Sequence, residues 1–185
     1  MASMVKLPVI DATPTNFADF GQVIEALPDD GEYGPRDAEL DLSHGIPRLY
    51  IVHLERKPFR FTKISHHANV TQCLGSIGGH DWYLGVSKAS IVKPDEVNEN
   101  VGQKIVQSKA GHSYVPPPPE DVHIFRFSGP KFVKLHIGTW HVGPLFRGDC
   151  MDFYILELSN TDEADHTTHN FKEEDGVVLS FDDQV

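Results

Sequence analysis

ISHHANVTQCLGSIGG at residues 64–79 and GPKFVKLHIGTWH at residues 129–141 are the two stretches that decide the predicted fold. Each places histidine among apolar and β-branched residues, the composition that is typical of buried strands. Glycine and proline bound both stretches, as they bound strands that end in tight turns. We therefore expect two strands that carry His67 and His136 to one pocket.

The spacing within the two stretches resembles the two motifs of the cupin superfamily. Four residues separate His67 from Gln72 and six separate Gln72 from Gly79. In the first cupin motif two histidines one residue apart are followed by a glutamate and a glycine, and in the second motif one histidine returns to the same pocket, as His136 would. The first histidine of the pair falls on Ser65 here, and the glutamate falls on Gln72.

These replacements bear on metal binding. The resemblance reduces the metal set to His67, Gln72 and His136. A neutral amide is a poorer ligand for a first-row transition metal than a carboxylate, and serine is poorer still. We therefore expect no required cofactor and at most weak binding of a divalent metal.

Composition limits the class of protein and of partner. The 185 residues suit one domain, 1–185, with a sizeable core. A net charge of −11 without a basic run argues against nucleic acid or an anionic membrane as partner. Cys73 and Cys150 lie in apolar surroundings and are expected to be buried thiols in a reducing compartment. With neither a targeting signal nor a stretch of about 20 apolar residues, we expect a cytoplasmic location.

The order of apolar runs and turn residues predicts a mainly β chain. We expect a short helix over 15–20, capped by Thr13 or Thr15, a loop over 28–47, and an acidic loop over 160–175. Residues 101–109 fit either a strand or a helical turn. Strands are expected over 5–10, 21–25, 48–54, 59–64, 71–76, 81–86, 90–92, 123–127, 132–136, 151–158 and 177–179. Short strands at even spacing indicate a cupin-like antiparallel β-barrel, or jelly roll, with short peripheral helices.

Three phrases resemble the signatures of one family more specifically. They are Phe20-Gly21-x-Val23-Ile24, then His67-x-x-x-Thr71-Gln72, then His136-x-x-x-Trp140-His141-x-x-Pro144-Leu145 followed by Asp152-Phe153. Together they are similar to the ureidoglycolate lyases, once called ureidoglycolate hydrolases, over about residues 17 to 158. Bacterial members carry a Glu-Arg pair where Ser65 and His66 stand here, and often a second histidine where Val142 stands.

The resemblance implies an activity and a set of site residues. It implies cleavage of the C–N bond of ureidoglycolate to glyoxylate and urea, a step of purine and allantoin catabolism, by a homodimer. The expected catalytic residues are His67, His136 and His141, and the expected substrate-binding residues are Lys63, Gln72 and Trp140. The replacement of Glu-Arg leaves two alternatives, a related enzyme acting on another small polar carboxylate and a non-catalytic metabolite-binding module.

Strand alternation gives expectations for side-chain direction. His67 and His136 should face one another across a pocket mouth, with Trp140 and His141 as one wall. His66 should point to the opposite face from His67, in a structural or exposed position. His166 and His169, in the acidic segment, are expected to be solvated.

Overall fold

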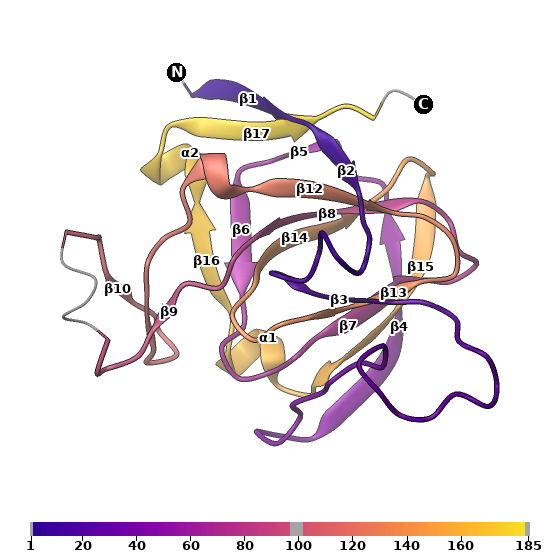
Figure 1. Cartoon of the computed structure of the whole chain (residues 1–185). Helices are drawn as coiled ribbons and strands as arrows, with labels where there is room; N and C mark the ends of the chain where they lie inside the picture. Colours follow the sequence, from indigo (N-terminus) through magenta and orange to yellow (C-terminus); the bar gives the residue numbers. More distant parts are fainter. Residues whose placement is uncertain (1, 97–101, 184–185) are drawn as a thin grey trace.

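The computed structural model describes residues 2–96 and 102–183, which form a mainly β protein (Figure 1). The helical segments are short: η2 (Pro119–Asp121), α1 (Thr161–Ala164) and α2 (Phe171–Glu174). The strands are β1 (Ser3–Leu7), β2 (Val9–Asp11), β3 (Gly21–Ile24), β4 (Pro47–Glu55), β5 (Arg60–Phe61), β6 (Lys63–His66), β7 (Cys73–Ser76), β8 (Trp82–Ser87), β9 (Ile91–Val92), β10 (Val106–Gln107), β11 (Ser113–Tyr114), β12 (His123–Phe127), β13 (Phe132–Leu135), β14 (Trp140–Leu145), β15 (Cys150–Leu158), β16 (Thr167–Asn170) and β17 (Val177–Phe181).

Two large sheets enclose the main core. One has the order β16-β6-β14-β8-β12-β2 and the other the order β3-β13-β7-β15-β4. Aromatic side chains from both sheets fill the space between them: Trp82 stacks on Phe127 with ring centroids 4.6 Å apart, and the edge of Phe153 meets Trp82 at 5.4 Å. Burial of these large rings is the principal stabilising term of the fold.

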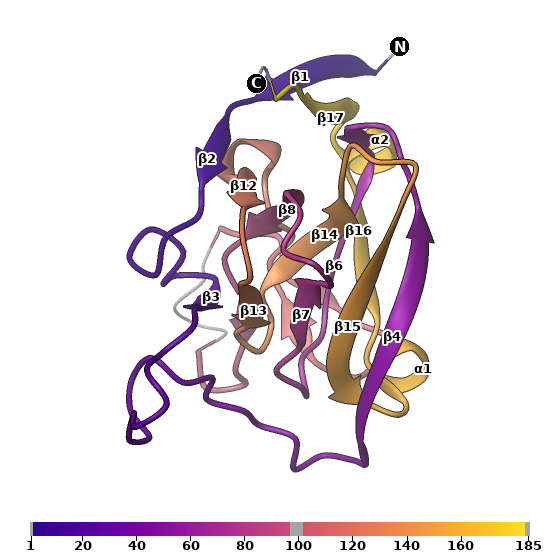
Figure 2. The same cartoon turned by 90° about the vertical axis from the view of Figure 1, so that its right-hand side faces the viewer.

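A third layer covers the opposite face of the six-stranded sheet. The small sheet β1-β17-β5 lies at one end of the molecule, as Figure 2 shows, and α2 packs beside it. A second core lies beneath this layer and contains Tyr83, Trp140, Phe171 and Phe181. Because both faces of β8 are covered, every residue of that strand is buried.

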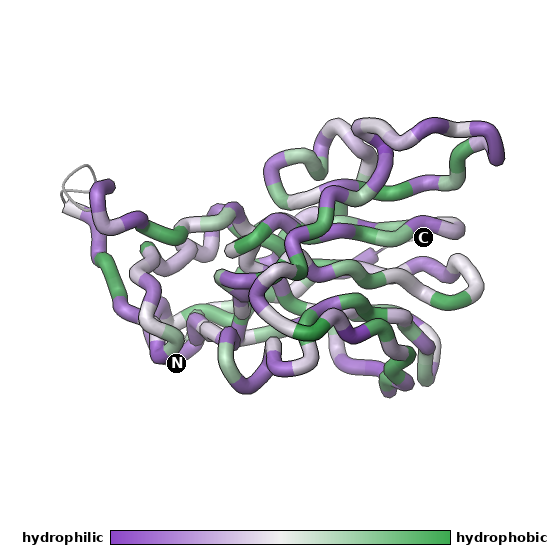
Figure 3. The backbone as a smooth tube through the Cα atoms, turned by 90° about the horizontal axis from the view of Figure 1, so that it is seen from below, coloured by the Kyte–Doolittle hydropathy of each residue, from purple (hydrophilic) through white to green (hydrophobic). Residues whose placement is uncertain are grey.

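Hydrophobic and hydrophilic residues alternate along much of the backbone (Figure 3), and in β4, an edge strand of the five-stranded sheet, this alternation matches one covered and one open face. In β4, Val52 and Leu54 pack against the main core, whereas Leu49 and Ile51 are exposed. This period of two is what a half-buried strand requires. The alternation fixes which side chains of β4 and β15 point between the two sheets.

The expected β class is confirmed, but the expected closed barrel is not found in the described residues. Each large sheet ends in two strands with no further partner, β16 and β2 in one sheet and β3 and β4 in the other. The pairing is also not purely antiparallel, because β1 runs parallel to β17 and β2 parallel to β12. The chain termini thus add parallel edges that local strand patterns do not reveal.

The predicted helix over 15–20 is wrong. Thr13 and Asn16 exchange two hydrogen bonds of capping type, Thr13 N–H to Asn16 Oδ1 at 2.8 Å and Asn16 N–H to Thr13 Oγ1 at 3.1 Å, but turns follow instead of a helix. The chain must enter β3 at Gly21, where a Cβ would lie 2.0 Å from the carbonyl oxygen of Lys134. This close contact allows only glycine at the start of β3. Before it, backbone bonds to the third residue back (Phe20 to Phe17) and to the fourth residue back (Phe17 to Thr13) are mixed, so no regular helix forms.

Three other expectations have different outcomes. The loop over 28–47 is confirmed up to the start of β4 at Pro47. The predicted loop over 160–175 is wrong, because this segment contains α1, β16 and α2, and β16 pairs with β6. Cys73 is buried as expected, but Cys150 is exposed because it begins β15 directly after a surface turn. Of the open segment 101–109, residues 106–107 are strand, and residue 101 lies outside the described residues.

In the ranges 2–96 and 102–183, no helix has the length and apolar character needed to cross a membrane.

Candidate functional site

A row of polar side chains crosses the inner face of the six-stranded sheet. Strand register places Thr168 opposite Ser65, Ser65 opposite His141, and His141 opposite Val86. Cross-strand partners share one face of a sheet, and Val86 belongs to the main core. The three polar side chains therefore face the space between the two large sheets.

His67 follows β6 directly and is fixed by a segment about a hundred residues away. Its Nδ1 lies 2.8 Å from the carbonyl oxygen of Asp165, and because a carbonyl only accepts, Nδ1 carries the proton. The Asp165 carboxylate accepts the N–H groups of Ala68 at 2.8 Å and Asn69 at 2.7 Å. Asp165 thus holds both the ring and the loop of His67, and it leaves Nε2 as the acceptor nitrogen of a neutral imidazole.

His141 lies beside His67, with ring centroids 5.4 Å apart. Its Nδ1 lies 3.1 Å from the Thr139 carbonyl oxygen, so this ring too is anchored through Nδ1–H. Burial lowers the pKa of His67, and burial together with the neighbouring His67 lowers the pKa of His141 to about 4. Both imidazoles are therefore neutral near pH 7, each with Nε2 able to accept a proton.

Gln72 belongs to a hydrogen-bonded group on the facing sheet. Its amide donates to Glu157 Oε2 at 2.7 Å, and the Tyr50 hydroxyl donates to Glu157 Oε1 at 2.9 Å. Glu157 is only 3% exposed. Burial, with the carboxylate of Glu157, raises the pKa of Tyr50 to about 12, and the same carboxylate is near enough to favour protonation of His67. The buried negative charge is thus satisfied by two donors and lies near the histidine pair.

The other predicted site residues are not part of this group. His136 Nε2 lies 3.0 Å from the carbonyl oxygen of Ala18, and the residue lines a separate cavity of about 350 Å³ near β3. Trp140 is fully buried in the second core and donates its indole N–H to Ser90 Oγ. Lys63 is exposed on β6. The structure therefore brings together His67 and His141, with Gln72 nearby through Glu157, and places His136 and Trp140 elsewhere.

His66 points away from His67, as alternation predicted, but it is fully buried rather than exposed. Its ring meets Trp140 edge to face with centroids 4.0 Å apart, and its Nε2 lies 2.7 Å from His112 Nε2. Burial and the neighbouring His112 lower the pKa of His66 to about 3. His66 is a neutral part of the second core.

The two histidines of the acidic segment differ from one another. His166 is 44% exposed, as expected. The prediction that His169 is solvated is wrong, because this side chain is only 3% exposed. His169 lies in β16, just before α2. Asp175 lies 2.7 Å from its Nε2, and Glu174 lies 3.2 Å from its Nδ1.

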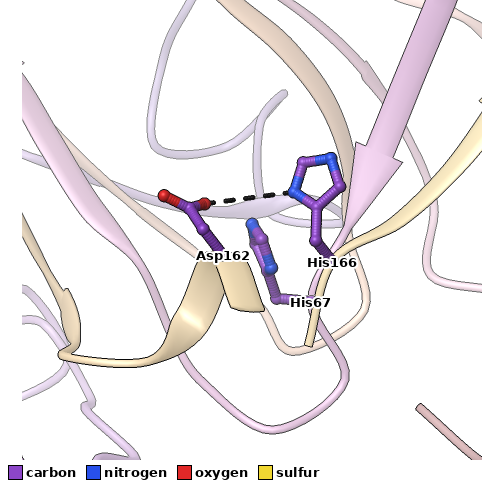
Figure 4. A group of neighbouring side chains, drawn as sticks. All are labelled: His67, Asp162 and His166. Carbon is purple, nitrogen blue, oxygen red and sulfur yellow. Dashed lines mark ion pairs between the residues drawn. The ribbon is translucent and has the colours of Figure 1, made fainter. Parts of the chain in front are cut away.

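His67, Asp162 and His166 form a group that could hold a metal ion. Each offers one ligand atom, and these atoms lie within 4.8 Å of one another. Figure 4 shows the ring of His67 pointing to the space between Asp162 and His166. Two imidazoles and a carboxylate are a donor set common for Zn²⁺ and other first-row divalent metals. Of the ligands expected from the sequence, His67 belongs to this group, whereas Gln72 and His136 do not.

Sequence reasoning missed Glu157, Asp162 and His166 as site residues. A signal existed for Glu157, because Met151, Phe153 and Ile155 alternate inward along β15 and the next inward position is a glutamate. Asp162 and His166 are four residues apart, a spacing that places two side chains on one side of a helical turn. Their proximity to His67 depends on the pairing of β16 with β6, which no local pattern shows.

Comparison with known proteins adds no assignment. The chain matches no protein-family model, and no curated protein matches it.

Proposed function

We propose that the chain is an enzyme that cleaves the carbon–nitrogen bond of ureidoglycolate, or of a closely similar carboxylate, by proton transfer through histidine. The observation that carries the proposal is the pair His67 and His141. Their rings lie 5.4 Å apart, each is anchored to a backbone carbonyl through Nδ1, and each offers Nε2 as an acceptor. Pre-oriented neutral imidazoles can accept a proton from one substrate atom and return it to another, as general acid–base catalysis requires.

The reaction needs one proton to move between two atoms of the substrate. His141 Nε2 takes the proton of the hydroxyl group, and the carbon–oxygen double bond of glyoxylate forms as the carbon–nitrogen bond breaks. The electron pair of that bond goes to the departing urea nitrogen, which receives the proton from the imidazolium. His67, held by Asp165, orients the substrate beside His141.

A second candidate is the same chemistry on another small polar carboxylate. Bacterial ureidoglycolate lyases carry Glu-Arg where Ser65 and His66 stand. Ser65 bonds to His166 and Thr168, and His66 is buried in the second core, so neither supplies the missing charges. This difference favours a substrate whose polar group differs from that of ureidoglycolate. The remaining alternative, a non-catalytic binding module, predicts ligand binding without turnover.

The arrangement of the sheets supports a relationship to the cupins. Two facing sheets, with histidines from β14 and the end of β6 between them, are what we would expect of a cupin-like jelly roll whose edges do not close. We propose this relationship on the motif spacing and on the placement of His67 and His141.

Turnover and ligand binding test the proposal together. Purified protein is incubated with ureidoglycolate, and glyoxylate and urea are quantified; equimolar formation above the uncatalysed rate is expected. In parallel, thermal shifts are measured with ureidoglycolate, glyoxylate and oxalate. Stabilisation without turnover would favour the binding module, and neither stabilisation nor turnover would refute the proposed function.

A further inference from the structure

We propose that His67, Asp162 and His166 form a binding site for one divalent transition-metal ion of the zinc type. The three residues come from two distant segments: His67 lies in the loop after β6, Asp162 lies in α1, and His166 lies between α1 and β16. One ligand atom from each lies within 4.8 Å of the other two. This ligand set shares only His67 with the set expected from the sequence.

The ligand atoms must move slightly closer together to bind an ion. Ligands about 2.0–2.1 Å from a tetrahedral ion lie about 3.3 Å from one another. Asp162 Oδ1 lies 4.0 Å from His166 Nδ1, and these two side chains are 75% and 44% exposed. Both can move by the remaining distance without displacing the core, whereas the buried His67 supplies the fixed point.

Each imidazole has its second nitrogen held by the protein. His67 uses Nδ1 for the carbonyl of Asp165, and His166 places Nε2 3.2 Å from Ser65 Oγ, which in turn lies 2.9 Å from Thr168 Oγ1. The nitrogens that remain, Nε2 of His67 and Nδ1 of His166, are those next to the Asp162 carboxylate (Figure 4). Anchoring of the outer nitrogen is the usual second shell of a metal-bound histidine.

Asp165 gives this site a rigid frame. Its carboxylate binds the N–H groups of Ala68 and Asn69, its carbonyl binds His67, and its own N–H donates to the Thr161 carbonyl oxygen at 3.1 Å. The loop after β6 and the turn that carries Asp162 and His166 are therefore tied together. The ligands are brought together by the fold before any ion arrives.

Other histidine–carboxylate groups in the described residues do not have this arrangement. His53 lies 2.7 Å from Asp152 on the exposed face of the five-stranded sheet, and this pair has no third donor close enough to complete a set. His169 contacts Glu174 and Asp175 through opposite nitrogens of its ring, so the two carboxylates cannot meet at one ion. Proximity of a histidine to a carboxylate is thus not enough, and convergence distinguishes the proposed site.

The ion would lie beside His141, because His67 is its neighbour at 5.4 Å. If the proposed function holds, the ion would bind the carboxylate oxygen of the substrate, and His141 would carry the proton. The substrate class is then a small acid that offers one or two oxygen ligands. Metal binding itself does not depend on that role.

The test measures metal binding by the protein alone. The 185-residue protein, stripped with a chelator, is titrated with Zn²⁺ by calorimetry. It is also titrated with Co²⁺, whose visible absorption reports ligand number and geometry. We expect one ion per chain, and at least a tenfold loss of affinity in Asp162→Asn and in His166→Ala. Both residues are exposed, and circular dichroism checks that the variants fold. Asp152→Asn, which removes the carboxylate of the other exposed pair, should bind like the wild type.

Two outcomes of the titration would contradict the proposed metal site. Wild-type protein that binds neither Zn²⁺ nor Co²⁺, or variants at Asp162 and His166 that bind as tightly as the wild type, would overturn the proposed metal site. Because no substrate is used, this failure would leave the lyase proposal standing. Metal binding with no turnover of any tested carboxylate would instead refute the function and keep the site.

Discussion

At the scale of single residues, two adjacent histidines lie in different environments. His67 lies next to His141 at the main interior, whereas His66 packs on Trp140 and contacts His112 in the second core. Strand alternation sends neighbouring side chains to opposite faces, and here both faces are covered. The same residue type is therefore a candidate for chemistry at one position and a packing residue at the next.

His66→Ala tests this distinction. The sequence pattern predicted a structural or exposed position for His66, and its complete burial makes the position structural. Removal of the ring leaves a cavity against Trp140, and we expect unfolding free energy to fall by about 2–4 kcal/mol in urea denaturation. His53→Ala, at a side chain that is 65% exposed, is the control and should change stability by less than about 0.5 kcal/mol. Equal stability of the two variants would contradict the packing described for His66.

Sequence predicted part of the candidate site at this scale. The motif phrases identified His67 and His141, which do lie together, and alternation gave the direction of His66. His136 lies apart because it follows β13 of the five-stranded sheet, where its ring contacts the Ala18 carbonyl. His166 was not predicted, because its proximity to His67 arises from the pairing of β16 with β6, and contacts between such distant segments leave no local period to read. Glu157 was missed although it continues the inward alternation of β15.

At the scale of elements, β4 is an exposed edge of the five-stranded sheet. Within the described chain it pairs with β15 along one side only. Leu49 and Ile51 on this strand are 71% and 65% exposed. Long edge strands with exposed apolar residues invite pairing with another strand. We propose a second copy as the partner, because antiparallel pairing of two β4 strands about Ile51 is self-complementary and obeys two-fold symmetry.

Replacement of Leu49 and Ile51 by glutamate tests this pairing. Light scattering at micromolar concentration should give twice 20.7 kDa for the wild type and 20.7 kDa for the double variant, because facing carboxylates repel across the axis. A wild type that is monomeric would contradict the proposed dimer, and a variant that remains dimeric would move the interface to another surface.

Element prediction succeeded where a strand's own pattern suffices. The strand over 123–127 matches β12 at both ends. The predicted helix over 15–20 is wrong because its backbone bonds mix two turn lengths. Strand β16 was missed because its polar sequence, Thr167–Asn170, becomes a strand only through pairing with β6. The closed barrel failed for a related reason: strand patterns do not specify which edges pair.

At the scale of the whole molecule, the C-terminal segment ties three strands together. Asp183 accepts hydrogen bonds from Tyr83 of β8 and from Arg126 of β12, and Arg126 also donates to Asp11 of β2 at 2.7 Å. Burial opposes ionisation of Asp183, but the bonds from Tyr83 and Arg126 outweigh it and lower the pKa of the carboxyl. The ionised carboxylate therefore stabilises the folded chain.

This linkage predicts an acid-dependent stability difference. Because the folded-state pKa of Asp183 lies below its unfolded value, its contribution is present at neutral pH and is lost as pH falls through the folded-state pKa. Asp183→Asn should be less stable than the wild type by about 1–3 kcal/mol at pH 7 and nearly equal to it at the lowest pH at which both remain folded. Asp182→Asn, at an exposed neighbour, is the control. A difference that does not change with pH would contradict this role of the charge.

The central claim is that His141, beside His67, carries the proton in cleavage of a small carboxylate. Steady-state kinetics of His141→Ala with ureidoglycolate, or with the carboxylate that the wild type turns over, tests it most directly. Loss of general acid–base catalysis predicts a fall in kcat of about 10²–10⁴-fold, with His53→Ala at wild-type rates and both variants folded. A His141→Ala protein that keeps the kcat of the wild type would contradict the claim.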